Sequence, residues 1–168
     1  HLSLNGQTDY SYNKEYVAQN ERADYLRYHA LHATLSTQWS GLSWFQPKLT
    51  LAGNLSWKKP DAFSATDNLL KNAYYSLTMD FYPISKLRLY VDFSQSVFEI
   101  AHSHYSVNSF LNAGLRYDFH PRWTVSADLS NLLNRKDYEV SLYQGANFQY
   151  YRVPLRGREF LVSLRFKY

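Results

Sequence analysis

The sequence predicts an all-β protein, and more specifically a transmembrane antiparallel up-and-down β-barrel with about eight strands in this chain. Apolar and polar residues alternate along about eight segments of the sequence, which indicates strands with one apolar face. Aromatic residues make up 18% of the 168 residues, and the 16 tyrosines suit a boundary between water and an apolar medium. The connections between segments alternate between long and short. Together these features predict a wall of strands that faces lipid on one side.

The apolar residues of each segment fall on a single parity, as one face of a strand requires. We expect the strands, in order, near residues 2–12, 25–39, 48–57, 72–83, 87–97, 108–119, 123–129 and 158–168. The first six apolar series are Leu2, Leu4, Tyr10, Tyr12; Leu31, Ala33, Leu35, Trp39; Leu49, Leu51, Leu55, Trp57; Ala73, Tyr75, Leu77, Met79, Phe81; Leu87, Leu89, Val91, Phe93, Val97; and Leu111, Ala113, Leu115, Tyr117, Phe119. The last two are Trp123, Val125, Ala127, Leu129 and Phe160, Val162, Leu164, Phe166, Tyr168.

The opposite parity carries charges, which in a barrel would face a wet lumen. These charges are Asp80, Arg88, Asp92, Arg116, Asp118, Asp128, Arg165 and Lys167. Aspartates interspersed with arginines predict ion pairs along the wall rather than an enzymatic site, and we expect no enzyme activity. No Gly-rich phosphate loop or nucleophile elbow is present in the sequence. A soluble β-sandwich also alternates in this way, so the alternation leaves both architectures open.

Connection lengths favour the membrane barrel. Long links are expected at 13–24, 58–70, 99–106 and 131–157, and shorter ones at 40–47, 83–86 and 120–123. Outer-membrane barrels join strands with short periplasmic turns and long extracellular loops. This order predicts a bacterial outer-membrane location with both chain ends periplasmic. Aromatic girdles are expected at Trp39, Phe81, Phe119, Trp123 and Tyr168 on the short side, and at Trp57, Tyr75 and Phe160 on the long side; alternatively, these residues cap the core of a soluble sheet.

Composition restricts the remaining classes. The chain has no apolar run of about eighteen residues, so no spanning helix is expected. It has no cysteine, and we expect no cofactor. A net charge of +4 without a basic run gives no reason to expect nucleic acid as a partner. Because the chain begins at His1 with no Met or signal sequence, we expect a processed, tagged or partial chain.

Two motifs near the end of the sequence carry a resemblance to a known family. "NLLNRKDYE" spans Asn131–Glu139, and "PLRGREF" spans Pro154–Phe160 before a final strand that ends on an aromatic residue. Over about the last 45 residues the sequence resembles the C-terminal end of TonB-dependent outer-membrane receptors. It departs from that pattern by inserting Leu155 and Arg156 between the Pro and the Gly-Arg pair, and by ending on Tyr168 where Phe or Trp is commoner. The tyrosine-rich, glycine-poor style resembles receptors of the Bacteroidota.

The resemblance implies a barrel of about 22 strands with an N-terminal plug. Residues 1–168 would then be the C-terminal portion of the barrel, without the plug. Such receptors import a scarce ligand, for example an iron chelate, cobalamin or a glycan. The implied partners are outer-membrane lipid, the remaining strands and plug, TonB acting through the plug, the barrel assembly machinery and a surface lipoprotein. The alternative is a complete eight-stranded barrel that serves as an anchor or adhesion scaffold, since eight strands are enough to close.

Two further groups of residues are candidates for function. In the predicted loop "SLYQGANFQYYRV", exposed aromatics and an arginine are typical of recognition surfaces, or they pack the loop over the barrel mouth. The ligand-binding candidates there are Tyr143, Phe148, Tyr150, Tyr151 and Arg152. The terminal strand, with Phe160, Val162, Leu164, Phe166 and Tyr168, resembles the strand by which outer-membrane barrels are recognised for assembly. His102 and His104 could share a metal ion, but only Glu99 lies nearby as a third ligand, so we expect no metal site.

Overall fold

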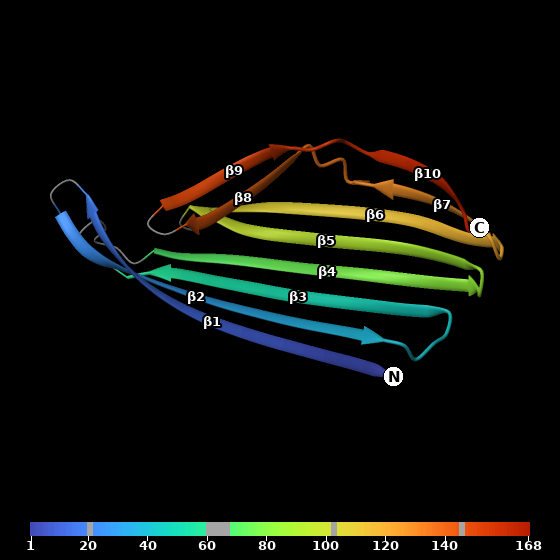
Figure 1. Ribbon diagram of the computed structural model, residues 1–168, viewed down its shortest axis with the longest axis horizontal. Helices are drawn as coiled ribbons and strands as arrows, with labels where there is room; N and C mark the ends of the chain where they lie inside the picture. Colours follow the sequence, from blue (N-terminus) through green and yellow to red (C-terminus); the bar gives the residue numbers. More distant parts are fainter. Residues whose placement is uncertain (20–21, 60–67, 102–103, 145–146) are drawn as a thin grey trace.

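The computed structural model describes residues 1–19, 22–59, 68–101, 104–144 and 147–168. Over these ranges the chain is all-β and forms an antiparallel, up-and-down sheet of eight strands in the order β1-β2-β3-β4-β5-β6-β7-β10 (Figure 1). The strands are β1 (Leu2–Gln19), β2 (Arg22–Trp39), β3 (Phe45–Lys58), β4 (Asn68–Ile84), β5 (Leu87–Ala101), β6 (His104–His120), β7 (Trp123–Ser130) and β10 (Glu159–Phe166). β8 (Asp137–Gln144) and β9 (Asn147–Pro154) form a separate hairpin. The described ranges hold no helix with the length and apolarity needed to cross a bilayer.

Strand pairing keeps each parity on one face across the whole sheet. Leu51 pairs with both Leu35 and Tyr75, and these neighbours carry the apolar parity of their strands. The next row is polar: Thr50 pairs with Ser36 and Ser76. Because side chains alternate across a strand, the sheet has one apolar face and one polar face over all eight strands. The alternation expected from the sequence is confirmed.

The two predicted long links at 13–24 and 99–106 are wrong. β1 and β2 pair as far as Gln19 opposite Arg22, and β5 and β6 pair as far as Ala101 opposite His104. The charged and polar residues in these stretches suggested loops, but aromatic cross-strand pairs such as Tyr16 with Tyr25 continue the strands. The short connections are confirmed at residues 40–44, 85–86 and 121–122, at the end of the sheet where both chain ends lie (Figure 1).

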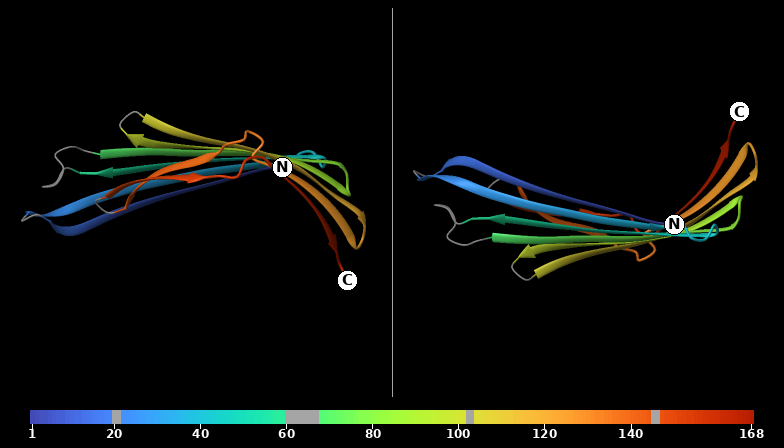
Figure 2. Two further views of the ribbon diagram at one scale, coloured as in Figure 1. Left: turned by 90° about the horizontal axis from the view of Figure 1, so that it is seen from above. Right: turned by 90° about the horizontal axis from the view of Figure 1, so that it is seen from below.

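The sheet is open, and β1 and β10 are its two edges. Apart from the small hairpin, the strands form a single twisted layer (Figure 2). The expected alternative of an eight-stranded barrel closing on itself requires β1 against β10, and the sheet does not have that pairing. The polar face gives the physical reason: an eight-stranded barrel has only enough interior for its own side chains, whereas this face also holds the β8–β9 hairpin.

A line of paired residues shows that the strands are inclined to the row of strand ends. The line begins near the start of β3, at the end of the sheet with the short connections. It reaches β10 at the other end of the sheet. Its members are Pro47, Met79, Val91, Ala113, Leu129 and Phe160. A progressive stagger of this kind is the register that tilted barrel strands require.

Burial is reversed relative to an ordinary sheet. On the apolar face, Leu35 and Leu51 are 42% and 41% exposed. The buried side chains Leu26 and Leu70 project from the polar face, where Leu26 is opposite Glu15 and Leu70 is opposite Ser56. The apolar face therefore lacks a covering layer among the described residues.

Candidate functional site

The β8–β9 hairpin lies against the polar face of β5 and β6. The ring of Tyr138 packs edge-on against Phe98 at 6.1 Å between centroids and lies 6.2 Å from Phe110. The stretch predicted as a recognition loop is thus mostly two paired strands, and its residues 145–146 lie outside the described residues. The strand-forming aromatic and β-branched residues of "FQYYRV" were the available signal for β9, but the resemblance to a receptor with a long final loop favoured a loop there.

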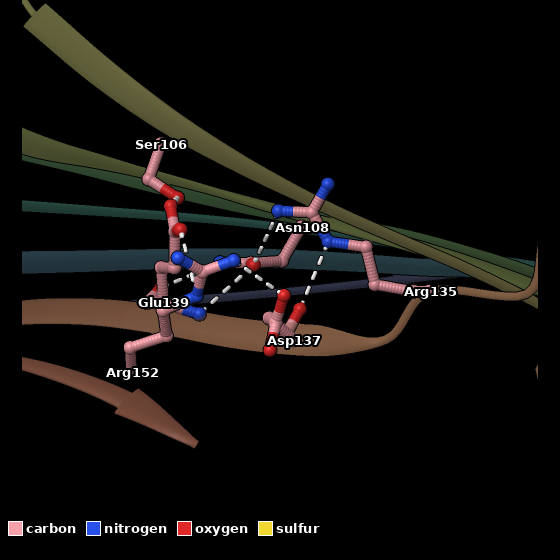
Figure 3. Close-up of polar contacts among 6 residues, drawn as sticks. All are labelled: Ser106, Asn108, Arg135, Asp137, Glu139 and Arg152. Atoms are coloured by element: carbon pink, nitrogen blue, oxygen red, sulfur yellow. Dashed lines mark hydrogen bonds and ion pairs between the residues drawn. The ribbon is translucent and has the colours of Figure 1, made fainter. Parts of the chain in front are cut away.

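Asn108 of β6 holds the free edge of β8 (Figure 3). Its side-chain Nδ2 donates to the carbonyl oxygen of Glu139 at 2.6 Å, and its Oδ1 accepts from the N–H of Glu139 at 3.1 Å. Asn108 is 0% exposed. A neighbouring strand would make the same pair of bonds, so this one amide caps a strand edge by satisfying both backbone groups of Glu139.

Charged groups surround this contact and neutralise one another. Ser106 Oγ donates to the Glu139 carboxylate at 2.6 Å, and Arg152 lies 2.6 Å from Asp137 and 3.7 Å from Glu139. The Ser106 hydroxyl, followed by the Tyr150 hydroxyl and Arg152, lowers the pKa of the Glu139 carboxyl. The hydrogen bond to Asp137 raises the pKa of Arg152. The cluster can fix the hairpin in place, and it offers no free acid or base for catalysis.

Arg135 completes the cluster from the segment before β8. Its Nη2 donates to Asn108 Oδ1 at 3.2 Å, and its Nε donates to the carbonyl oxygen of Asp137 at 2.9 Å (Figure 3). Asn108 Oδ1 therefore accepts two hydrogen bonds, one of them from a charged donor, which strengthens the network.

Asn131 joins the two ends of the segment between β7 and β10, which carries the β8–β9 hairpin. These joined ends are here called the neck. Asn131 has φ of 53°, and its Nδ2 donates to the carbonyl oxygens of Arg135 at 2.7 Å and Arg156 at 2.9 Å. Its N–H donates to Asn112 Oδ1 at 2.9 Å, which fixes the neck to β6. One side chain thus joins the start of the segment to its end.

Asn134 and Gly157 complete this neck. Asn134 has φ of 55°, a conformation that asparagine tolerates better than most residues. A Cβ at Gly157 would lie 2.9 Å from Asn134 Oδ1, so glycine allows the two segments to approach. The Asn-Leu-Leu-Asn motif, noted in the sequence only as part of a resemblance, therefore has a mechanical role.

The predicted ligand-binding residues do not form one surface. Tyr150 and Tyr151 are both exposed, but as adjacent strand residues they point to opposite faces of the hairpin. Arg152 is engaged by Asp137. Tyr143 and Phe148 are paired near the tip, and their side chains lie outside the described residues.

The predicted lumen charges share the polar face and are held in place there. Arg88 Nη2 lies 2.7 Å from Asp80, and Arg116 lies 3.5 Å from Asp118. Hydroxyl groups hold the other two aspartates: Thr78 donates to Asp92 at 3.2 Å and Tyr90 donates to Asp128 at 2.7 Å. Arg165 lines a small hollow with Arg116, Thr124, Ser126 and Ser163.

The residues of the predicted assembly strand lie on the apolar face of the open edge. Phe160, Val162, Leu164 and Phe166 are exposed along β10, followed by Tyr168. Phe166 packs against Trp123 at 4.7 Å between ring centroids. Of the two candidate histidines, His104 is described and His102 lies outside the described residues; the described part of the chain holds no cluster suited to a metal ion.

Comparison of the chain with known protein families, curated proteins and solved structures finds no match. Asn108, Ser106 and Glu139 were not among the residues that the sequence singled out. Polar parity was the only signal for Asn108 and Ser106, and it does not distinguish them from the other polar residues on this face.

Proposed function

We propose that this chain is a sector of a bacterial outer-membrane β-barrel, with its apolar face toward lipid and both chain ends on the periplasmic side. One observation carries the proposal: the only element stacked on the sheet in the described ranges covers the polar face, while the apolar face is bare. In water an exposed apolar surface of this extent would be covered, whereas lipid makes the bare face favourable.

The dimensions of the apolar face support this proposal. Along β2 the apolar series runs from Trp39 to His29, about 33 Å of strand. With the tilt of about 45° usual for such strands, this covers roughly the 25 Å height of a lipid-facing band. Aromatic contacts border both ends: Phe45 stacks on Phe81 at 4.9 Å at the short-connection end, and His29 stacks on Trp57 at 5.1 Å at the other.

A large barrel fits the polar face better than a small one. The hairpin occupies space on that face, so the lumen must be wider than eight strands enclose. The outer edges of β1 and β10 carry backbone groups that would cost several kcal/mol each if left unpaired in lipid. Additional strands beside both edges satisfy these groups.

The sequence resemblance supports a more specific role. We infer that the chain is the C-terminal part of a TonB-dependent receptor that imports a scarce ligand such as an iron chelate, cobalamin or a glycan. In such a receptor the polar face lines the lumen around the plug, and the β8–β9 hairpin narrows the mouth on the outer side. TonB would act on the plug of that receptor.

Membrane fractionation and surface labelling test the proposal. The chain has no cysteine, so single cysteines can be introduced into the full gene product. We expect the protein in the detergent-extracted outer membrane. An impermeant maleimide added to intact cells should label Gln149→Cys in the hairpin but not Ser85→Cys in a short connection. Recovery in the soluble fraction, or the reverse labelling pattern, would contradict the proposal.

A further inference from the structure

On the first three strands the apolar face ends in aromatic residues, and cations follow them directly. Lys14 of β1 comes after Tyr12, Arg27 of β2 is adjacent to His29 on the same face, and Lys59 comes two residues after Trp57. Lys14 is directly opposite Arg27. The N–H of Lys59 donates to the carbonyl oxygen of Arg27 at 3.2 Å, which places Lys59 beside Arg27 on its other side. The three residues form one row, here called the cation row, and all three are exposed.

Aromatic pairs border the cation row above and below. On the side toward the aromatic girdle, Tyr12 and His29 lie 4.9 Å apart between ring centroids. On the outer side, Tyr16 and Tyr25 meet edge-on at 5.4 Å, and Lys14 Nζ lies 4.0 Å from the centroid of Tyr25. The ring of Tyr25 holds Lys14 close to the sheet, and the aromatic pairs provide stacking surfaces for an amphiphilic molecule.

The charges of the cation row are not balanced on their own face. At the described positions of β1, β2 and β3, the apolar face carries no Asp or Glu; Asp9 and Glu15 have the polar parity. Like charges directly opposite one another destabilise a pair of strands. On β4, Lys71 follows, and there a carboxylate accompanies the cation, because Glu99 accepts a hydrogen bond from the backbone N–H of Lys71 at 3.0 Å.

We propose that Lys14, Arg27 and Lys59 bind the phosphate groups of an anionic lipid in the leaflet on the hairpin side. This inference rests on the proposed membrane location. The cation row lies just beyond the aromatic girdle, at the height where lipid headgroups begin. Arg27 can bind a phosphate through two parallel N–H donors, and the two lysines add point charges on either side. The bound phosphates offset the repulsion within the row.

Lipid binding by the full gene product tests this site. The probes are a bisphosphorylated lipid A and its dephosphorylated form, presented in detergent micelles. The site variant is Lys14→Gln/Arg27→Gln/Lys59→Gln. The matched control is Lys86→Gln/Arg122→Gln/Lys167→Gln, which removes the same charge at the opposite end of the sheet. We expect the site variant to bind the phosphorylated lipid at least about tenfold more weakly, and the control to bind it as wild type does. Arg27→Lys, which keeps the charge but not the two parallel donors, should bind the lipid more weakly than wild type and more tightly than the triple site variant.

The remaining outcomes each overturn the inference. Equal loss in both triple variants would show a general effect of net charge. Displacement of the lipid by millimolar inorganic phosphate would show a free-phosphate site. Equal binding of the dephosphorylated lipid would show that the phosphate groups do not contribute to binding. Each of these results can occur in a protein that fractionates with the outer membrane, so failure of this inference is distinct from failure of the proposed function.

Discussion

The side-chain amide of Asn108 bonds both the N–H and the carbonyl oxygen of Glu139, at 3.1 and 2.6 Å. Residues 31 apart in the chain are thus joined as two paired strand residues would be. The contact places an otherwise exposed hairpin edge against the wall. It therefore governs whether the hairpin stands fixed over the polar face.

Removing this amide should release the hairpin. Asn108→Ala leaves the N–H and carbonyl of Glu139 without partners, a loss of about 2–3 kcal/mol of docking free energy. We expect faster hydrogen exchange across residues 137–154 with little change in β1–β4. Asn13→Ala, at an exposed position of β1, is the control. Unchanged exchange in the hairpin would show that the aromatic contacts of Tyr138 are sufficient.

Hairpin docking should weaken in acid. The pKa of Glu139 is lowered in the folded protein, first by the Ser106 hydroxyl, then by Tyr150 and Arg152. A carboxyl with a lowered folded pKa contributes stability above its ordinary pKa of about 4.3, and that stability is lost as pH falls through the folded value. The protection of residues 137–154, taken as the exchange rate relative to the intrinsic rate at each pH, should therefore fall as pH falls below about 4. Glu139→Gln should flatten this profile; an unchanged acid response in Glu139→Gln would assign it to another group.

Gly114 should not tolerate alanine. The Tyr90 ring crosses Gly114 to reach Asp128, and a Cβ at Gly114 would lie 2.5 Å from that ring. Alanine must displace Tyr90, at a cost of about 1–3 kcal/mol in the free energy of unfolding measured with urea. Gly53 is the matched control, since a Cβ there meets nothing within 4 Å. Equal effects of Gly114→Ala and Gly53→Ala would mean that Tyr90 relocates freely.

Deleting residues 166–168 should block insertion into the outer membrane without reducing synthesis. The deletion removes the Phe166 contact with Trp123 and the last residues of the strand that resembles an assembly signal. Membrane fractionation and resistance to unfolding in cold detergent measure insertion. Lys167→Ser, which keeps both aromatic residues, is the control. Normal insertion of the truncated protein would remove the assembly role from this strand.

The faces of the sheet could be predicted from the sequence because period-two alternation survives in every strand of the wall. The aspartates at 80 and 118 carried a second signal, since arginines of the same parity lay close enough in the chain to pair with them. The ends of β1, β2, β5 and β6 could not be predicted, because charged residues such as Lys14 and Glu99 look like loop residues when the face they border is unknown.

The site was harder to predict than the wall. The role of Asn108 depends on a contact with a hairpin that follows one further strand, β7, and no local pattern encodes that contact. Arg152 was singled out for ligand binding because it is charged and near aromatics, but Asp137 lies directly beside it once β8 and β9 pair. Because β8 and β9 pair, Arg152 stabilises the hairpin through Asp137 and is not a free group for ligand binding.

The neck at Asn131 allows the hairpin to vary in sequence while its connections to β7 and β10 keep the same geometry. Because Asn131 joins Arg135 to Arg156, the wall strands receive the same entry and exit geometry whatever lies between them. In the proposed barrel, sequence changes within the hairpin could then alter what the mouth admits without new demands on the wall strands. Variation in selectivity would be confined to one short stretch, and the rest of the chain could remain under selection for assembly alone.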